Sequence, residues 1–321
     1  MQFQYLIDKV NSADFEEHPF SHVQIKNFLS DGHFQQIVAA SEIAISGFSS
    51  DQQLFAALFD KGYKIIEFPG CITDREVYLR WHRDKDSKVN YTNTACEGFG
   101  VTLRLVAQQS SIISDLSAFM ASKEFQASLA AKFGIEFDSV TYDTGIQKYL
   151  DGYEISPHPD TRNKALTYMV NINPNAHSEK HGHHTHYLKF REEFNYVQAY
   201  WEGHPKEDRC WVPWTWCESQ KVQRENNSIV IFAPRNNTIH AVKASYNHLD
   251  GQRTQMYGNL WHREVQATPG PEWENFVIKP SPPKLTLAGK VKSLVPREVK
   301  ALIKAKGGPD ANVMVGRVRR S

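Results

Sequence analysis

Three residues in the second half of the chain have the types and spacing to hold a metal ion. His158 and Asp160 stand two positions apart in "SPHPDTR", and His240 opens the segment "HAVKASY" 80 residues after Asp160. In an extended strand, residues two apart point to the same face, so the first two would present an imidazole and a carboxylate side by side. Two histidines and one carboxylate form the facial triad that holds Fe(II) and leaves three coordination positions open. The set therefore predicts a non-haem iron site.

A second group of interest follows thirteen residues after His240, where Arg253 and Thr254 open "RTQMYGNLWH". An arginine can form a bidentate pair with a carboxylate, which a lysine would hold only as a point charge. The neighbouring threonine could add its hydroxyl to the same carboxylate. The two residues predict a dicarboxylate bound beside the metal, with Arg263 as an alternative arginine.

The segment that contains these residues has the residue pattern of a β-rich fold. From about Ile135 to Val265, short runs of β-branched and aromatic residues alternate with Gly, Pro, Asn and Asp. Many short strands separated by turn residues are typical of a sandwich or a barrel. The strands are predicted in "FDSVTYDTGIQKYL", "ALTYMVNINP", "HYLKF", "SIVIFAP", "IHAVKASY" and "RTQMYGNLWH".

The first 135 residues predict a mixed α/β segment. A short strand is expected from His22 to Ile25, followed by a helix with Ser30 or Asp31 as its N-cap. Further along, "SSIISDLSAFMASKEFQASLAAKFG" predicts one or two helices that end at Gly134, because glycine readily adopts the left-handed conformation that ends helices. We expect these helices to pack on the outside of a sheet.

The last part of the chain is predicted to be a linker and a basic tail. "ATPGPEWENFVIKPSPPKL" is dense in proline and should run extended, and "PREVKALIKAK" predicts a short basic helix. From Ser281 to Ser321, ten residues are basic and two are acidic, although the formal net charge of the whole chain is only +1. The tail could dock on an acidic partner, and a solvated tail is the simpler interpretation.

Taken in order, Tyr149, "HPD", the strand "NSIVIF", His240 and Arg253 resemble the Fe(II)- and 2-oxoglutarate-dependent oxygenases, in a layout most similar to the prolyl-hydroxylase-like branch. The resemblance covers roughly residues 19–263. It implies an α+β fold whose core is a double-stranded β-helix, a distorted jelly roll, with flanking N-terminal helices. The expected organisation is one oxygenase domain at 1–265, with an α/β support at about 1–135 and the jelly-roll core at about 136–265. The linker and tail would occupy 266–321.

The resemblance also implies an activity. Such an enzyme hydroxylates an unactivated C–H bond with Fe(II), O2 and 2-oxoglutarate, releases succinate and CO2, and can be stimulated by ascorbate. Halogenating relatives lack the carboxylate ligand, so Asp160 favours hydroxylation. The long interval between Asp160 and His240 implies an insertion between the strands. Carried over by residue, the roles are iron binding by His158, Asp160 and His240, and 2-oxoglutarate binding by Arg253, Tyr149 and Thr254.

Candidates for contact with the oxidised substrate surround this core: Arg162, His184, His186 and Trp261. The run "AHSEKHGHHTHYLKF" contains five of the 14 histidines. It predicts a solvent-facing loop that leads into a strand, on which His184 and His186 share one face and could point inward; a second metal site is the alternative. The tryptophan-rich "YWEGHPKEDRCWVPWTWCE" predicts either a lid over the substrate or a β-hairpin packed on the barrel.

The composition bears on what kind of protein this is and which partners it has. The chain is 40% hydrophobic and 23% charged, as in ordinary globular proteins, and the balanced charge makes nucleic acid an unlikely partner. No apolar stretch is long enough for a membrane span, and the N-terminus does not resemble a secretory signal, so a cytoplasmic enzyme without a membrane partner is expected. The expected partner is a small-molecule or peptidyl substrate. Alternatives are an oxygenase that modifies a protein or nucleic acid recruited by the basic tail, and a catalytically silent jelly-roll module that binds sugars.

Overall fold

A computed structural model describes residues 2–67, 71–84 and 100–264. Within these residues the chain forms two antiparallel β-sheets and seven α-helices, which is the mixed class expected from the sequence. The linker, the basic tail and the short helix expected in 266–321 lie outside the described residues. None of the helices in the described part is long and apolar enough to cross a lipid bilayer.

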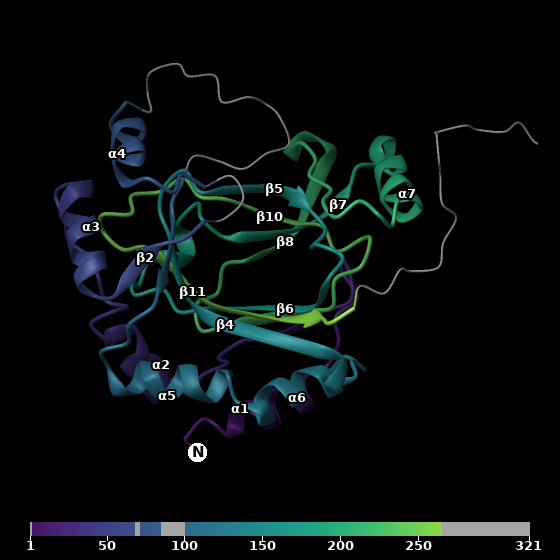
Figure 1. Ribbon diagram of the computed structural model, residues 1–321, viewed down its shortest axis with the longest axis horizontal. Helices are drawn as coiled ribbons and strands as arrows, with labels where there is room; N and C mark the ends of the chain where they lie inside the picture. Colours follow the sequence, from purple (N-terminus) through teal and green to yellow (C-terminus); the bar gives the residue numbers. More distant parts are fainter. Residues whose placement is uncertain (1, 68–70, 85–99, 265–321) are drawn as a thin grey trace, which may run out of the picture. The chain divides into compact units, whose positions relative to one another are not determined.

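The two sheets form two layers, seen edge-on in Figure 1. The larger sheet has the strand order β1-β9-β6-β11-β4-β3-β2, and the smaller one has the order β5-β10-β7-β8. The strands of the larger sheet are β1 (Val23–Ile25), β2 (Tyr63–Ile65), β3 (Thr102–Leu105), β4 (Val140–Tyr149), β6 (Lys164–Asn171), β9 (Ile229–Phe232) and β11 (Arg253–His262). Those of the smaller sheet are β5 (Glu154–His158), β7 (Thr185–Phe190), β8 (Cys217–Gln223) and β10 (His240–Lys243).

Four helices lie against the face of the larger sheet that points away from the smaller one, namely α1, α2, α5 and α6 (Figure 1). The helices are α1 (Tyr5–Ser12), α2 (Asp31–Ala39), α3 (Asp51–Asp60), α4 (Arg75–Arg83), α5 (Ser111–Met120), α6 (Lys123–Lys132) and α7 (Tyr196–Gly203). Single turns of 3-10 helix occupy Phe137–Ser139, Ser178–Lys180, Glu192–Phe194 and Trp214–Trp216.

The predicted helix boundaries are confirmed. Ser30 caps α2 and accepts a hydrogen bond from the backbone N–H of His33, which is one of the donors that the first helical turn leaves unpaired. The segment after Ser110 forms two helices, α5 and α6. The second begins at a capping Ser122 and is followed by Gly134 at φ +66°, in the left-handed region.

Strands β4 and β11 have two chemically different faces. They pair along their whole length, with Arg253 opposite Tyr149. Because successive side chains alternate, Ile146, Met256 and Leu260 point toward the helices and join the main apolar core. The odd-numbered side chains of the same strands, including Tyr149 and Arg253, therefore point into the space between the two sheets.

All six predicted strands are present, and the structure adds β2, β3, β5 and β8, which were not predicted. Two other expectations also differ from the structure. Strand β5 ends at His158, so Asp160 lies just past the strand instead of within it. The tryptophan-rich segment forms α7, a coil and a 3-10 turn before β8, so it is not a β-hairpin. Strands β1, β2 and β3 come from the first 135 residues, so that segment adds strands to the larger sheet as well as helices. The proposed domain boundaries stay a prediction.

Candidate active site

The three predicted metal ligands come together at the end of two neighbouring strands. His158 ends β5, and His240 begins β10 directly opposite it in the antiparallel register. Their ring centroids are 4.4 Å apart, and Nε2 of His240 lies 3.9 Å from Oδ1 of Asp160. One ligand atom from each of the three buried residues lies within 4.8 Å of the others. This spacing allows all three to bind one ion.

Backbone carbonyl groups prepare both histidines for a metal. Nδ1 of His158 lies 2.7 Å from the carbonyl oxygen of Ser156, and Nδ1 of His240 lies 3.0 Å from that of Thr238. A carbonyl oxygen can only accept, so the ring proton must be on Nδ1 of each histidine, and Nε2 keeps its lone pair. Both rings therefore present the atom that a metal requires.

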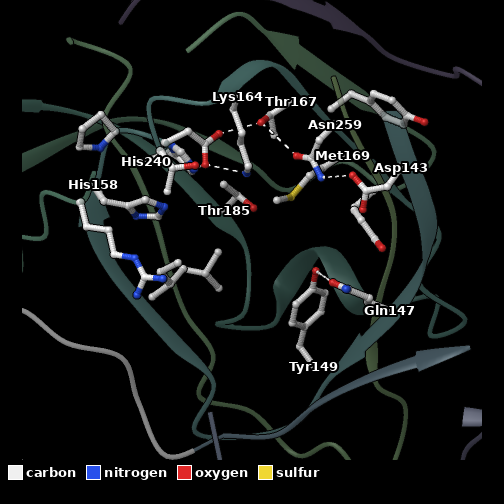
Figure 2. A pocket seen from close by; sticks show the side chains of 18 of the residues that line it. Asp143, Gln147, Tyr149, His158, Lys164, Thr167, Met169, Thr185, His240 and Asn259 are labelled. Carbon is white, nitrogen blue, oxygen red and sulfur yellow. Dashed lines mark hydrogen bonds and ion pairs between the residues drawn. The ribbon is translucent and has the colours of Figure 1, made fainter. Parts of the chain in front are cut away.

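The carboxylate of Asp160 is held by two donors. Its Oδ2 accepts a hydrogen bond of 2.7 Å from the hydroxyl of Thr167, and its Oδ1 pairs with Nζ of Lys164 at 2.8 Å (Figure 2). Burial by itself raises the pKa of Asp160, but the ammonium charge of Lys164, its hydrogen bond to the carboxylate and the polar rings of His240 and His158 outweigh it and lower the pKa below its ordinary value. The carboxylate is thus ionised and oriented.

Burial also keeps the two histidines neutral. It lowers the pKa of His158 to about 3, with a further contribution from His240, and it lowers the pKa of His240 as well. A histidine must be unprotonated to bind a metal. At neutral pH the site therefore offers two neutral imidazoles and one carboxylate, the donor set that suits Fe(II).

Arg253 lies in the same cavity with an unused donor. Its side chain is 2% exposed, and Nη2 donates to the hydroxyl of Thr185 at 3.0 Å. The guanidinium carbon lies 4.4 Å from the ring centroid of Tyr149. Among the described residues Nη1 is buried without a hydrogen-bond partner, and a buried donor of a charged group is costly to leave unpaired. A carboxylate is the natural partner for this atom.

The other two residues expected to assist Arg253 behave differently. Tyr149 lines the cavity, and its hydroxyl donates to Oε1 of Gln147 at 2.6 Å. Thr254 points to the opposite face of β11, where its hydroxyl accepts from Lys148 at 2.8 Å and donates to the carbonyl oxygen of Gln252. Neighbouring residues of a strand cannot share a face, so the structure does not bring Thr254 to the carboxylate site.

Arg263, the alternative arginine, is exposed and donates from Nε to the carbonyl oxygen of Asp138 at 3.2 Å. It lies just beyond the end of β11 and does not line the cavity. Of these two candidate arginines, Arg253 is therefore the one that lines the cavity with the metal ligands.

A cavity of about 390 Å³ connects these groups. Its walls come from β3, β4, β6 and β11 of the larger sheet, from β5, β7 and β10 of the smaller sheet, and from residues 208–211. This volume is within the range of small-molecule sites in proteins. It offers space for a dicarboxylate and a second molecule of modest size.

Of the four residues expected to contact the oxidised substrate, Trp261 lines the cavity. Its indole N–H donates to Oδ1 of Asp143 at 2.6 Å, and Nζ of Lys164 lies 5.4 Å from its ring centroid. The ring therefore forms a wall of the cavity close to the metal ligands.

Arg162 has a structural role instead. Its guanidinium lies 3.6 Å from the ring centroid of Trp201 and donates to the backbone carbonyl oxygens of Trp201, His204 and Glu207 and to Oδ1 of Asn236. These contacts tie the end of α7 to the segment that follows Asp160. The guanidinium donates its hydrogen bonds to other protein groups, and Arg162 does not line the cavity.

The histidines of the run do not line the cavity. Strand β7 presents Thr185 to the cavity, so alternation turns its neighbours His184 and His186 away. His186 contacts the hydroxyl of Ser219 at 2.9 Å and the ring of Trp214. Within the described residues, neither group of side chains that could hold a metal includes a histidine of the run.

Several residues of the cavity were not identified from the sequence. Asp160, Thr167, Asn259, Asp143 and Trp261 form a continuous row of hydrogen bonds across β6, β11 and β4. Figure 2 shows the part of this row that joins Thr167, Asn259 and Asp143. Each strand contributes a polar side chain among apolar ones, which is a weak signal until the register of the sheet is known. The residues missed in this way are Arg104, Asp143, Thr167, Thr185 and Asn259.

The second group that could hold a metal consists of Asp51, His82 and His248. Here Nδ1 of His248 accepts from the backbone N–H of Asp151 at 3.1 Å, and Nε2 lies 2.7 Å from Oδ1 of Asp51. The ring proton is therefore on Nε2, the atom that faces the cluster, which is the reverse of the arrangement in His158 and His240. Both ring nitrogens of His82 face carboxylates. This cluster is a carboxylate–histidine network rather than a metal site.

No protein-family model matches the chain, and no curated protein matches it. Among solved structures, a prolyl-4-hydroxylase of Pseudomonas putida aligns with 82% of this chain and 100% of its own, at 11% identity and a TM-score of 0.38. The epimerase SnoN, in complex with Fe3+, alpha-ketoglutarate and nogalamycin RO, aligns with 81% of this chain and 84% of its own, at 10% identity and a TM-score of 0.38.

HygX from Streptomyces hygroscopicus, with nickel, 2-oxoglutarate and hygromycin B bound, aligns with 67% of this chain and 88% of its own, at 8% identity and a TM-score of 0.30. TM-scores of this size assign neither a branch nor a reaction to this chain. The solved structures that resemble it include members of the Fe(II)- and 2-oxoglutarate-dependent superfamily that its sequence resembles, and the prolyl-hydroxylase-like branch stays a prediction.

Proposed function

We propose that this protein is an Fe(II)- and 2-oxoglutarate-dependent dioxygenase that hydroxylates an unactivated C–H bond of a small-molecule or peptidyl substrate, with release of succinate and CO2. The two facing antiparallel sheets support a double-stranded β-helix as its core. The observation that best supports the proposal is the set of residues that line one cavity. Three of them present ligand atoms suited to a metal, and an arginine presents a buried N–H group with no hydrogen-bond partner among the described residues.

The donor set fits the metal, and the arginine fits the cosubstrate. Nε2 of His158, Nε2 of His240 and the carboxylate of Asp160 would hold Fe(II), which leaves three positions for other ligands. Nη1 of Arg253 would bind the distal carboxylate of 2-oxoglutarate, beside the ring of Tyr149. When bound, Fe(II) activates O2 at the expense of 2-oxoglutarate and so supplies the oxidant for the C–H bond.

The protein contributes orientation and exclusion of water. Thr167 fixes one oxygen of Asp160, and Thr185 fixes one nitrogen of Arg253, so neither group has to be ordered when ligands bind. The metal ligands are between 5% and 8% exposed, so few water molecules can approach them from outside the cavity. Trp261 and Met169 form part of its wall.

Succinate formation tests the proposal without knowledge of the substrate. The purified chain, supplied with Fe(II), ascorbate, O2 and 2-oxoglutarate, should convert 2-oxoglutarate slowly to succinate. His158→Ala and Asp160→Ala should abolish both this turnover and the binding of Ni(II), an oxygen-inert substitute. His177→Ala, which changes an exposed histidine of the histidine-rich run, is the matched control and should retain both.

Arg253→Ala separates the two parts of the site. It should raise the 2-oxoglutarate concentration needed for turnover at least tenfold, since a charge-assisted pair is lost, and leave Ni(II) binding in place. A wild-type protein that binds neither Ni(II) nor 2-oxoglutarate would instead be a silent jelly-roll module, and the proposal would be refuted.

A further inference from the structure

The cavity contains a second arginine that the proposed reaction does not use. Arg104 lies on β3, where it pairs in register with Gln147, whereas Arg253 pairs with Tyr149. Both arginines line the same cavity. Two strand spacings and two residues separate their positions, which corresponds to on the order of 12 Å between their Cα atoms. The two arginines therefore occupy different positions on the wall of the cavity.

The guanidinium of Arg104 has no hydrogen bond or ion pair with any described residue. Its Nε is buried without a hydrogen-bond partner among the described residues, and the guanidinium carbon lies 5.0 Å from the ring centroid of Tyr257. Two other cations of the cavity already lie beside a carboxylate. Lys164 pairs with Asp160 at 2.8 Å, and Arg209 lies 3.9 Å from Asp208. Among the residues that the structure describes, Arg104 therefore has no ion-pair partner.

Tyr257 and Gly145 keep Arg104 directed into the cavity. Gly145 lies opposite Tyr257 in the β4–β11 pair, and a Cβ at this glycine would stand 3.1 Å from the tyrosine ring. Because there is no side chain at position 145, the ring can lie across β4 toward β3. There it supports the guanidinium by a cation–π contact, with the guanidinium carbon 5.0 Å from the ring centroid.

Asp143 indicates how a substrate would be oriented. It lies two residues beyond Gly145 on β4, and its Oδ1 accepts from Asn259 at 3.1 Å and from Trp261 at 2.6 Å. A negative group would be repelled from this end of the cavity and attracted to Arg104. An anionic substrate would therefore place its charge at Arg104 and its uncharged part near Asp143 and the metal ligands.

We propose that Arg104 binds a carboxylate of the substrate that is oxidised, so that this substrate is an organic acid anion. The assignment rests on the proposed function, because Arg253 is taken up by 2-oxoglutarate. A carboxylate matches the planar fork of a guanidinium with two parallel hydrogen bonds. Arg104 is then the residue that selects the substrate by charge.

Benzoate and its uncharged counterpart benzamide test this without knowledge of the natural substrate. Their binding is measured by calorimetry on the full chain loaded with Ni(II) and saturating 2-oxoglutarate, so that Arg253 is occupied. Benzoate should bind at millimolar concentration, and benzamide at least tenfold more weakly. Arg104→Gln should weaken benzoate binding at least tenfold, since one charge-assisted pair is lost. Equal affinity for both compounds, or no benzoate binding, would overturn the proposal.

Other variants make the result specific. Arg209→Gln changes an arginine of the same cavity that already has a carboxylate neighbour, and it should bind benzoate within twofold of wild type. Arg104→Lys keeps the charge without the fork and should bind benzoate several-fold more weakly, which provides a second variant if Arg104→Gln does not fold. Benzoate binding that survives both Arg104 variants, or that depends on Arg209 instead, contradicts the assignment.

Two further measurements separate the possible failures. Phenyl phosphate that binds more tightly than benzoate would overturn the choice of a carboxylate. An Arg104→Gln protein that loses 2-oxoglutarate affinity as strongly as Arg253→Ala would place Arg104 in the cosubstrate site and also overturn the proposal. If wild type binds no 2-oxoglutarate, the proposed function fails, while benzoate binding that depends on Arg104 would still show the anion site.

Discussion

Arg253 of the larger sheet donates from Nη2 to the hydroxyl of Thr185 in the smaller sheet, at 3.0 Å, and its Nη1 remains unpaired. This hydrogen bond joins the two layers beside the metal ligands. It fixes the plane of the guanidinium and so decides where its free edge points. An arginine held in this way is already ordered for a carboxylate before the carboxylate arrives.

Thr185→Val should weaken 2-oxoglutarate binding about threefold to tenfold, because Arg253 loses the hydrogen bond that orients it. Calorimetry with the Ni(II)-loaded protein measures the change, and the affinity for Ni(II) itself should stay the same. Thr254→Val is the matched control, since Thr254 adjoins Arg253 in sequence but points to the other face of β11. If Thr254→Val lost affinity for 2-oxoglutarate and Thr185→Val did not, we would have assigned the wrong side of these strands to the cavity.

The two partners of Asp160 should have opposite effects on metal affinity. Thr167→Val removes the hydroxyl that orients the carboxylate and should weaken Ni(II) binding about tenfold to 100-fold. Lys164→Met removes an ammonium group 2.8 Å from the same carboxylate, which competes with the metal, and should strengthen Ni(II) binding. Competition with a chelator of known affinity measures both variants, and changes of the same sign would contradict this account of the site.

The chain should bind one metal ion through the described residues. The tautomer of His248 places a proton on the nitrogen that faces the Asp51 cluster, so that cluster is not available to a metal. Metal analysis after dialysis against Ni(II) should give one equivalent for wild type and for Asp51→Asn, and none for His158→Ala. Two equivalents in wild type that fall to one in Asp51→Asn would show that the cluster binds metal after all.

Lys148 should make stability depend on pH. Burial lowers its pKa from 10.5 to about 7, although its Nζ donates to Thr254 and to the carbonyl oxygen of Ile43. Between pH 7 and 10.5 the unfolded chain therefore binds a proton at Lys148 that the folded chain does not. The free energy of unfolding should rise with pH in this range, by at most about 1.4 kcal/mol per pH unit from this residue.

Urea denaturation of wild type and Lys148→Met at pH 7 and pH 9 isolates this contribution. The difference in free energy of unfolding between the two proteins should change in favour of wild type as the pH rises, because only wild type loses the cost of a buried ammonium group. A difference that does not change with pH would mean that Lys148 keeps an ordinary pKa in the folded protein.

The sequence by itself determined the order of the chemical groups and the kind of element that carries them. The sequence identifies His158, Asp160, His240 and Arg253, because few residue types bind metals or carboxylates and these residues follow one another in a set order. The six predicted strands are readable because β-branched runs bounded by turn residues differ from the helical pattern before them. None of this requires knowledge of which strands are neighbours.

Only the tertiary structure decided which side of each strand faces the cavity. Arg253 and Thr254 are adjacent and both polar, so the sequence does not tell which of them faces the cavity. The register of the strand in the sheet decides this, since a shift of one residue exchanges the two faces. For the same reason Thr185 enters the cavity and His184 and His186 do not. Arg104 joins the site because β3 pairs with β4 across a long stretch of chain, a contact formed by the folding of the whole sheet and not by any local pattern.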